Sequence, residues 1–95
     1  MPDTAAVLGT GAWGTTLAML LADRGLRVRL WEVDPARADE IRRQGVSPTF
    51  PDVRLPAGIE VTSSLAEAVD GAWIAVLAVP AAHVRTTARD LGARP

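Results

Sequence analysis

Short apolar runs alternate along the chain with longer stretches in which apolar residues recur every three or four positions. The apolar runs predict four strands, over residues 5–8, 27–31, 59–62 and 73–79. The periodic stretches predict helices over residues 13–24, 35–44 and 81–91, with a shorter one after Ser63 or Ser64. Strands that alternate with helices indicate a parallel sheet with right-handed crossovers. The first and last strands are apolar at every position, which predicts burial on both faces of the sheet.

The expected helix over 13–24 has an apolar face and a marked end. Its apolar residues are spaced by three or four positions, at Trp13, Leu17, Leu20 and Leu21. Gly25 follows where a glycine commonly ends a helix in a left-handed conformation. By contrast, the stretch 45–58 is rich in glycine and proline and predicts a loop.

Polar residues mark the starts of the next two helices. Pro35 suits the first helical position, because its missing N–H and fixed φ cost nothing there, and Asp34 is then the expected N-cap. Ser64 and Glu67 have the spacing of a capping box, in which two side chains satisfy free N–H groups at a helix start.

A glycine-rich loop joins the first strand to the first helix. Residues 9–14 match G-x-G-x-x-G. In that motif Gly9 permits the tight turn, Gly11 lets the backbone approach a pyrophosphate, and Gly14 lets helix and strand pack closely. The helix N-terminus adds free N–H groups and a positive dipole end, which attract phosphates. The pattern predicts a βαβ unit over 5–34 that binds a dinucleotide, with contacts from Gly9, Thr10, Gly11, Ala12, Trp13 and Gly14.

Two other interpretations of the loop fit less well. A P-loop continues with lysine and then serine or threonine, whereas this chain continues with Thr15 and Thr16 and contains no lysine. A turn that serves only chain geometry gives no reason for the acidic residue that follows the second strand.

That acidic residue is Glu32, which lies 18 positions after Gly14. Dinucleotide-binding folds place a carboxylate about 20 residues after the glycines, where it binds the 2′-hydroxyl of the adenosine ribose. Asp34 is the alternative, but its position before a proline favours the helix cap. A carboxylate repels a 2′-phosphate and Val33 cannot neutralise one, so the sequence predicts NAD rather than NADP as cofactor.

Composition narrows the class of protein and its partners. A chain of 95 residues, 48% hydrophobic and 22% charged, is one globular domain at most. A net charge of −1 gives no reason to expect nucleic acid or a membrane surface as partner. The absence of cysteine, a single histidine and scattered carboxylates predict no metal site. The apolar run 72–82 is too short to span a bilayer, and we expect a soluble cytoplasmic protein.

Four stretches match one family in order and spacing. They are the loop 11–15, the strand 28–31 that ends in Leu-Trp, the segment 50–56 that ends in Leu-Pro, and the Ala-Val-Pro at 78–80. Together they resemble the NAD(P)-dependent glycerol-3-phosphate dehydrogenases, whose segment before the third strand has the form Y-L-P-G-x-x-L-P. A tryptophan in the glycine loop together with this Leu-Pro segment is far more specific than the three glycines alone.

The resemblance implies hydride transfer between a nicotinamide and carbon 2 of glycerol 3-phosphate or dihydroxyacetone phosphate. It implies that Ala12 and Trp13 touch the cofactor phosphates and that Val33 flanks the adenosine ribose. It also places the nicotinamide half near Val79 and Pro80. The family often has a small residue and then arginine or histidine where this chain has Glu32 and Val33, a departure that strengthens the expectation of NAD.

Several remaining residues have a structural interpretation. His83 matches a position where some relatives place an aromatic residue against the cofactor, but an exposed residue in the first turn of a helix is expected more than an acid or base. Trp31 and Trp73 are expected in the core or at its rim. Arg85 and Arg89, four positions apart, are expected on a solvated helix face.

The fold expected is α/β, a Rossmann-type parallel sheet of order 3-2-1-4 with flanking helices, and an incomplete domain. The family's catalytic lysines and its helical substrate domain have no counterpart in these residues. We therefore expect 1–95 to be the N-terminal part of a dinucleotide-binding domain, without catalytic residues, that meets a triose phosphate only with a C-terminal part. Alternatives are a stand-alone NAD-sensing module and the NAD domain of a 3-hydroxyacyl or 6-phosphogluconate type dehydrogenase. The open edge of the fourth strand is expected to pair with another molecule, and a homo-oligomer is compatible with this.

Overall fold

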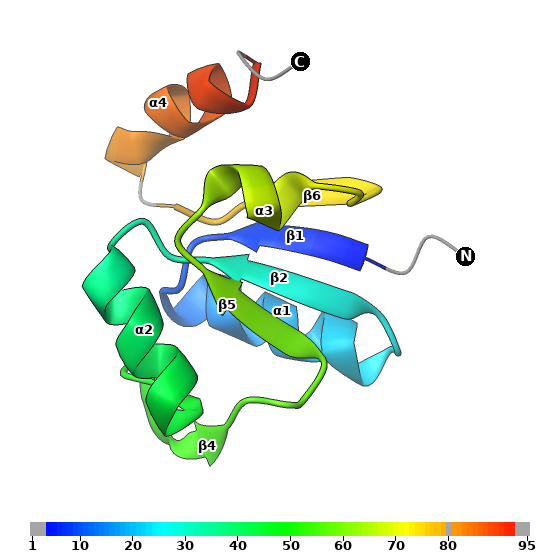
Figure 1. The fold of residues 1–95 in the computed structure, drawn as a ribbon, viewed down its shortest axis with the longest axis vertical. Helices are drawn as coiled ribbons and strands as arrows, with labels where there is room; N and C mark the ends of the chain where they lie inside the picture. Colours follow the sequence, from blue (N-terminus) through cyan, green and yellow to red (C-terminus); the bar gives the residue numbers. More distant parts are fainter. Residues whose placement is uncertain (1–3, 80, 93–95) are drawn as a thin grey trace.

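A four-stranded parallel sheet forms the centre of the computed structural model, which describes residues 4–79 and 81–92 (Figure 1). Its strands are β1 (Thr4–Leu8), β2 (Arg27–Trp31), β5 (Ile59–Thr62) and β6 (Ile74–Leu77). They lie in the order β5-β2-β1-β6, and each neighbouring pair is parallel. This is the order 3-2-1-4 of the four predicted strands, so the Rossmann-type architecture is confirmed.

Helices cover both faces of the sheet. They are α1 (Ala12–Asp23), α2 (Pro35–Gln44), α3 (Leu65–Val69) and α4 (Ala81–Gly92). On one face, Ala18 of α1 and Ile41 of α2 pack with alternate residues of β1 and β2, such as Val7 and Leu30. On the other face, Ala68 of α3 packs with the strand residues whose side chains point to that side of the sheet, Ala6, Leu8 and Trp31. All four residues of β1 that were predicted to be buried, 5–8, are fully buried.

The side of α1 that faces the sheet agrees only in part with the apolar pattern, because Leu21 packs against the core as predicted but Trp13 and Leu20 do not. Its buried residues are Gly14, Thr15 and Ala18, whereas Trp13 and Leu20 are 67% and 57% exposed. The helix lies so close to the end of β1 that an ideal Cβ on Gly14 would be 2.1 Å from the carbonyl oxygen of Gly9. Small side chains occupy the fully buried positions for this reason, and the bulky Trp13 and Leu20 are exposed.

The predicted helix ends are confirmed, except for one half of the capping box at α3. Gly25 has φ +92°, and its N–H donates to the carbonyl of Ala22 at 3.0 Å, which closes the last turn of α1. The Asp34 side chain accepts a hydrogen bond from the N–H of Ala36 at 3.1 Å and caps α2. Ser64 caps α3 by accepting from the N–H of Glu67 at 3.2 Å. The reciprocal bond of the predicted capping box is not formed, because the N–H of Ser64 donates to the Thr62 hydroxyl at 3.0 Å.

The prediction of a loop over 45–58 is wrong in part. This stretch contains β3 (Val46–Ser47) and β4 (Phe50–Arg54), an antiparallel pair separate from the main sheet. Each strand of a two-stranded ribbon has one unpaired edge, so Pro51 can lie in β4 without breaking a ladder of hydrogen bonds. The N–H of Leu55 also donates to the carbonyl of Gly45 at 2.8 Å, which ties the two ends of the ribbon together.

The last strand is shorter and more exposed than its apolar run predicted. β6 is the edge of the sheet, its residues are exposed or half-buried, and Trp73 is 59% exposed. The expectation that Trp73 packs in the core or at its rim is wrong, because an edge strand has a neighbour on one side only. Trp31 is buried as expected, and its indole N–H donates to the carbonyl of Ser63 at 3.1 Å.

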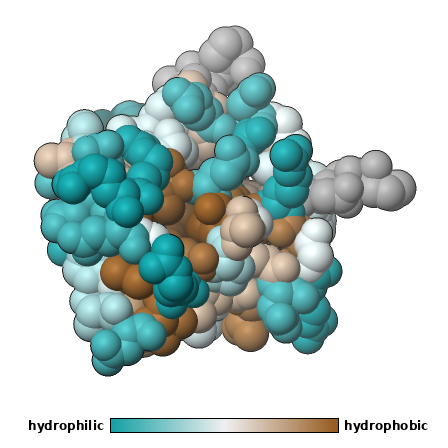
Figure 2. All heavy atoms as spheres, turned by 60° about the horizontal axis from the view of Figure 1, so that its bottom comes forward, coloured by the Kyte–Doolittle hydropathy of each residue, from teal (hydrophilic) through white to brown (hydrophobic). Residues whose placement is uncertain are grey.

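Apolar side chains also reach the surface elsewhere, in the middle of the face seen from the lower end of the molecule (Figure 2).

Candidate dinucleotide-binding site

The first glycine of the loop is required by the backbone and by packing. Gly9 has φ +136°, a conformation that residues with a side chain rarely adopt. An ideal Cβ at this position would lie 2.3 Å from the carbonyl oxygen of Ala78, just after β6. The N–H of Gly9 donates to the carbonyl of Trp31 at 3.0 Å. The turn after β1 is therefore fixed between the ends of its two neighbouring strands.

Gly11 and Gly14 differ from each other in what a side chain would meet. At Gly14 an ideal Cβ would be 2.1 Å from the Gly9 carbonyl oxygen, whereas at Gly11 no atom lies within 4 Å. The protein's own packing therefore requires glycine at position 14 but not at position 11. Open space beside the Gly11 backbone is what a loop that admits a pyrophosphate needs, and it fits the role expected of this residue.

The N-terminus of α1 also suits an anion. Asp34 and Ser64 cap α2 and α3 with side-chain oxygens, but the N-cap of α1 is Gly11, which has no side chain to accept a hydrogen bond. Thr15 is the first residue of α1 whose N–H bonds back to Gly11, at 2.9 Å. The N–H groups before it belong to the first turn, where free donors and the helix dipole attract phosphate oxygens.

A cavity of about 730 Å³ lies over this loop. Its size is that of a typical small-molecule site. Its walls include the segments that follow β1, β2 and β6, at the carboxyl ends of the strands. The predicted site residues that line it are Gly9, Thr10, Gly11, Ala12, Trp13, Glu32, Val33 and Val79. Gly14 lies beneath the loop rather than in the cavity wall. The sequence prediction thus named residues that the fold brings together.

Glu32 is the buried acidic residue of the cavity wall, with 5% of its surface exposed. The Thr10 hydroxyl donates to its Oε1, and the N–H of Asp34 donates to its Oε2 at 2.9 Å. Its own N–H donates to the carbonyl of Thr62 at 2.9 Å, which fixes the backbone beside β5. The carboxylate therefore has a defined orientation at the cavity wall.

Two predicted site residues are not placed. Pro80 lies outside the described residues. His83 is a residue of α4, but its side chain is outside the part of the chain that the structure describes. Their contacts with a cofactor stay predictions.

The cavity wall also contains residues that the sequence did not indicate. They include Arg37 in the first turn of α2, Thr49 between β3 and β4, and Thr86, Thr87 and Asp90 of α4. Arg37 had a local signal, since it follows the predicted ribose-binding position by five residues at the start of a helix. Thr49 had none, because its stretch was predicted to be a loop. The side of α4 that faces the cavity could not be chosen from the sequence.

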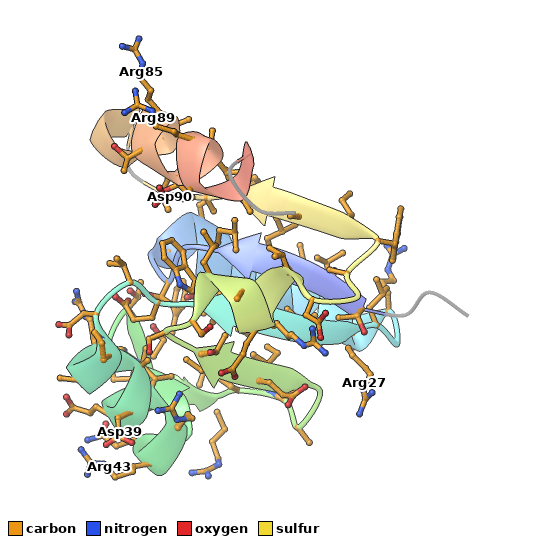
Figure 3. The ribbon with its side chains drawn as sticks, turned by 45° about the horizontal axis from the view of Figure 1, so that its top comes forward. Arg27, Asp39, Arg43, Arg85, Arg89 and Asp90 are labelled. Carbon is orange, nitrogen blue, oxygen red and sulfur yellow. The ribbon has the colours of Figure 1, made fainter. Side chains whose placement is uncertain are left out.

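The charged residues of α4 point in two directions (Figure 3). Arg85 and Arg89 point away from the sheet, both are exposed, and neither lines the cavity, as expected for a solvated face. Asp90 points toward the strands. On α2, Asp39 and Arg43 form an exposed ion pair at 3.3 Å on the outer side of the molecule.

Two further observations concern other kinds of site. Within residues 4–79 and 81–92, no three histidine, cysteine or acidic side chains are grouped as metal ligands would be. In the same part of the chain, no helix is long and apolar enough to cross a membrane.

A parallel sheet whose strand order reverses between β1 and β6, with a glycine loop and an uncapped helix N-terminus beside that point, defines the Rossmann class of dinucleotide-binding domains. The sequence makes the assignment narrower. Residues 4–94 match the family model described as the N-terminus of NAD-dependent glycerol-3-phosphate dehydrogenase, and the chain belongs to that family.

Relatives with known names agree with this assignment. The chain is 49% identical over 92 residues to a glycerol-3-phosphate dehydrogenase [NAD(P)+] of Moorella thermoacetica, and 44% identical over 91 residues to that of Thermus thermophilus. These alignments cover 96% and 95% of the chain but 28% of each relative. A crystal structure of glycerol-3-phosphate dehydrogenase from Coxiella burnetii matches with a TM-score of 0.74 and 32% identity, over 79% of this chain and 23% of that one. The chain therefore spans about a quarter of the length of these relatives.

Proposed function

We propose that this chain is the cofactor-binding part of a glycerol-3-phosphate dehydrogenase, and that residues 1–95 are the N-terminal part of its dinucleotide-binding domain. One observation carries the proposal: the open space at Gly11, beside a helix N-terminus without a side-chain cap. The related proteins named glycerol-3-phosphate dehydrogenase [NAD(P)+] support the choice of reaction.

The parts of the cavity suit the parts of a dinucleotide. The pyrophosphate would lie over Gly11, Ala12 and Trp13, where free N–H groups face it. The adenosine ribose would bind at Glu32 beside Val33, after β2. The nicotinamide half would lie near Val79, which follows β6, with Pro80 and His83 close to it.

The charges at the adenosine end favour NAD over NADP in our proposal. Glu32 is buried, so its negative charge is poorly screened and would repel a 2′-phosphate. Arg37 lines the same cavity and carries the opposite charge, but it is exposed and therefore well screened. We expect the buried carboxylate to outweigh the exposed guanidinium, and Arg37 to reduce the preference without reversing it.

The chemistry divides between the cofactor and the protein. When bound, the nicotinamide would exchange a hydride with carbon 2 of glycerol 3-phosphate or dihydroxyacetone phosphate. The residues of this chain would bind and orient the dinucleotide. The catalytic lysines implied by the family resemblance cannot come from these 95 residues, which contain no lysine. We assign them, and the contacts with the triose phosphate, to a C-terminal part of the enzyme that includes a helical substrate domain. Glycerol 3-phosphate, the product of the reduction, would serve glycerophospholipid synthesis in the cytoplasm.

An assay of the protein expressed from its complete reading frame tests the proposal. Purified protein should oxidise NADH when dihydroxyacetone phosphate is added. The reaction is measured by the loss of absorbance of the reduced nicotinamide. The Gly11→Ala variant is the control, and it should lose both cofactor binding and turnover. Tight NAD binding without turnover would favour a sensing module instead. Turnover of a 3-hydroxyacyl or 6-phosphogluconate substrate, but not of dihydroxyacetone phosphate, would contradict the substrate assignment.

A further inference from the structure

The side chain of Thr10 is engaged inside the protein. Its hydroxyl donates to Oε1 of Glu32, which is 22 positions away in the sequence. A threonine hydroxyl has a single proton to donate. While this bond exists, the side chain has no proton for a phosphate oxygen, although Thr10 lies in the loop over which a pyrophosphate would bind. Its side chain therefore has a task other than phosphate binding.

That task concerns the carboxylate of Glu32. Thr10 holds one carboxylate oxygen, and the N–H of Asp34 holds the other at 2.9 Å. Each carboxylate oxygen can accept two hydrogen bonds, so each has one position left for a donor in the cavity. A pair of neighbouring hydroxyls, as on a ribose, matches two such positions on one carboxylate.

Thr10 is itself held in place. Its carbonyl oxygen accepts a hydrogen bond from the hydroxyl of Thr15 at 3.0 Å, and Thr15 is completely buried in the first turn of α1. A continuous series of hydrogen bonds thus runs from α1 through the glycine loop to the end of β2 and the start of α2. The orientation of Glu32 depends on the same loop that would hold the pyrophosphate.

We propose that Thr10 is the positioning residue for Glu32, and that its hydroxyl fixes the carboxylate in the orientation that accepts a ribose diol and excludes a 2′-phosphate. The inference rests on the proposed NAD site. Without the Thr10 donor, one oxygen of a buried carboxylate would lose its partner, which is costly, and the side chain would rotate toward water in the cavity. A rotated carboxylate loses the matched pair of hydrogen bonds to the ribose.

The test compares dissociation constants for NAD and NADP in five variants of the protein expressed from its complete reading frame. Thr10→Val keeps the shape but removes the donor, and Thr10→Ser keeps the donor. Thr16→Val is the matched control, since Thr16 is exposed on α1 and does not line the cavity. Thr10→Val in a Glu32→Ala background removes the partner through which Thr10 is proposed to act, and it is compared with Glu32→Ala alone.

We expect Thr10→Val to weaken NAD binding about tenfold, as the loss of one hydrogen bond to a charged group does, and NADP binding much less. The preference for NAD should therefore fall in Thr10→Val, persist in Thr10→Ser and Thr16→Val, and show no further change when Thr10→Val is added to Glu32→Ala. Equal losses for both cofactors, or the same loss in the Glu32→Ala background, would overturn the inference and mean that Thr10 contacts the cofactor itself.

A second measurement needs no cofactor. If Thr10 holds the carboxylate, Thr10→Val should speed hydrogen exchange at the Asp34 amide, which bonds to the other carboxylate oxygen. An unchanged exchange rate would overturn the inference. Wild-type protein that binds neither dinucleotide would contradict the proposed function, and the exchange rate would still decide the role of Thr10.

Discussion

Gly14 is the position at which one added methyl group should most disturb the fold. An ideal Cβ there would lie 2.1 Å from the oxygen and 2.9 Å from the carbon of the Gly9 carbonyl, and 3.2 Å from the Ala78 Cβ. Two of these three atoms belong to the backbone and cannot rotate away. Gly14→Ala must therefore move α1 away from the end of β1, the fully buried centre of the sheet.

The free energy of unfolding should fall by about 2 kcal/mol. Overpacking of a core costs about 1–3 kcal/mol, and an obstacle made of backbone belongs at the upper end of that range. Alanine regains about 1 kcal/mol over glycine inside a helix, which offsets part of the cost. For a domain of this size each kcal/mol lowers the melting temperature by about 4–8 °C, so Gly14→Ala should melt about 8–16 °C below the wild type.

Gly11→Ala is the matched control, because the same chemical change is made three positions earlier in the same loop. No atom lies within 4 Å of its Cβ, and φ is −70°, so the melting temperature should stay close to that of the wild type. Its NAD affinity should nevertheless fall, since the methyl group would occupy the space of the pyrophosphate. Thermal denaturation followed by circular dichroism, together with NAD titration, measures both. A wild-type melting temperature for Gly14→Ala, or unimpaired NAD binding by Gly11→Ala, would refute the reasoning.

Four further predictions follow from the site and the sheet edge. Glu32→Ser combined with Val33→Arg should shift the preference from NAD to NADP in fluorescence titrations, and an unchanged ratio of affinities would show that Glu32 does not read the ribose. Arg37→Ala should weaken NADP binding about threefold, the size of an exposed ion-pair interaction, and leave NAD binding unchanged; equal effects on both cofactors would contradict this. Asp34→Ala should lower the melting temperature by about 4–8 °C, because a lost N-cap costs about 1 kcal/mol, whereas Asp34→Asn should preserve it. The 95-residue chain should associate through the exposed edge of β6 in sedimentation experiments, more weakly as Ile74→Lys, and a strictly monomeric chain would count against an open edge.

The elements that the sequence predicted best are those for which local pattern and tertiary packing require the same residues. The predicted bounds of β2, β5 and α2 agree with the structure residue by residue. For α2 the reason is visible, because Asp34 caps the helix and Pro35 begins it, both through contacts within a few residues. The glycine loop was predictable for a similar reason, since the positive φ of Gly9 and the contact of Gly14 with the Gly9 carbonyl both belong to one strand–turn–helix unit.

The features that the sequence did not predict depend on contacts between distant segments. The close approach of α1 to β1 turns Gly14 and Ala18 inward and leaves Leu20 exposed, which an apolar periodicity cannot reveal. The exposure of β6 follows from its place at the sheet edge and not from its composition. The cavity-facing side of α4, with Thr86, Thr87 and Asp90, depends on how this helix packs beside the distant strand β1 and the glycine loop.

The central claim is that a dinucleotide binds over residues 9–14 with its ribose at Glu32. Titration of isotope-labelled protein with NAD, followed by amide chemical shifts in NMR spectra, tests it most directly. The account predicts saturable shifts at Gly11, Ala12 and Trp13 and at the residues around Glu32, with little change in the outward-facing part of α2 around Asp39 and Arg43. Absence of shifts at saturating NAD, or shifts confined to a different surface of the molecule, would contradict it.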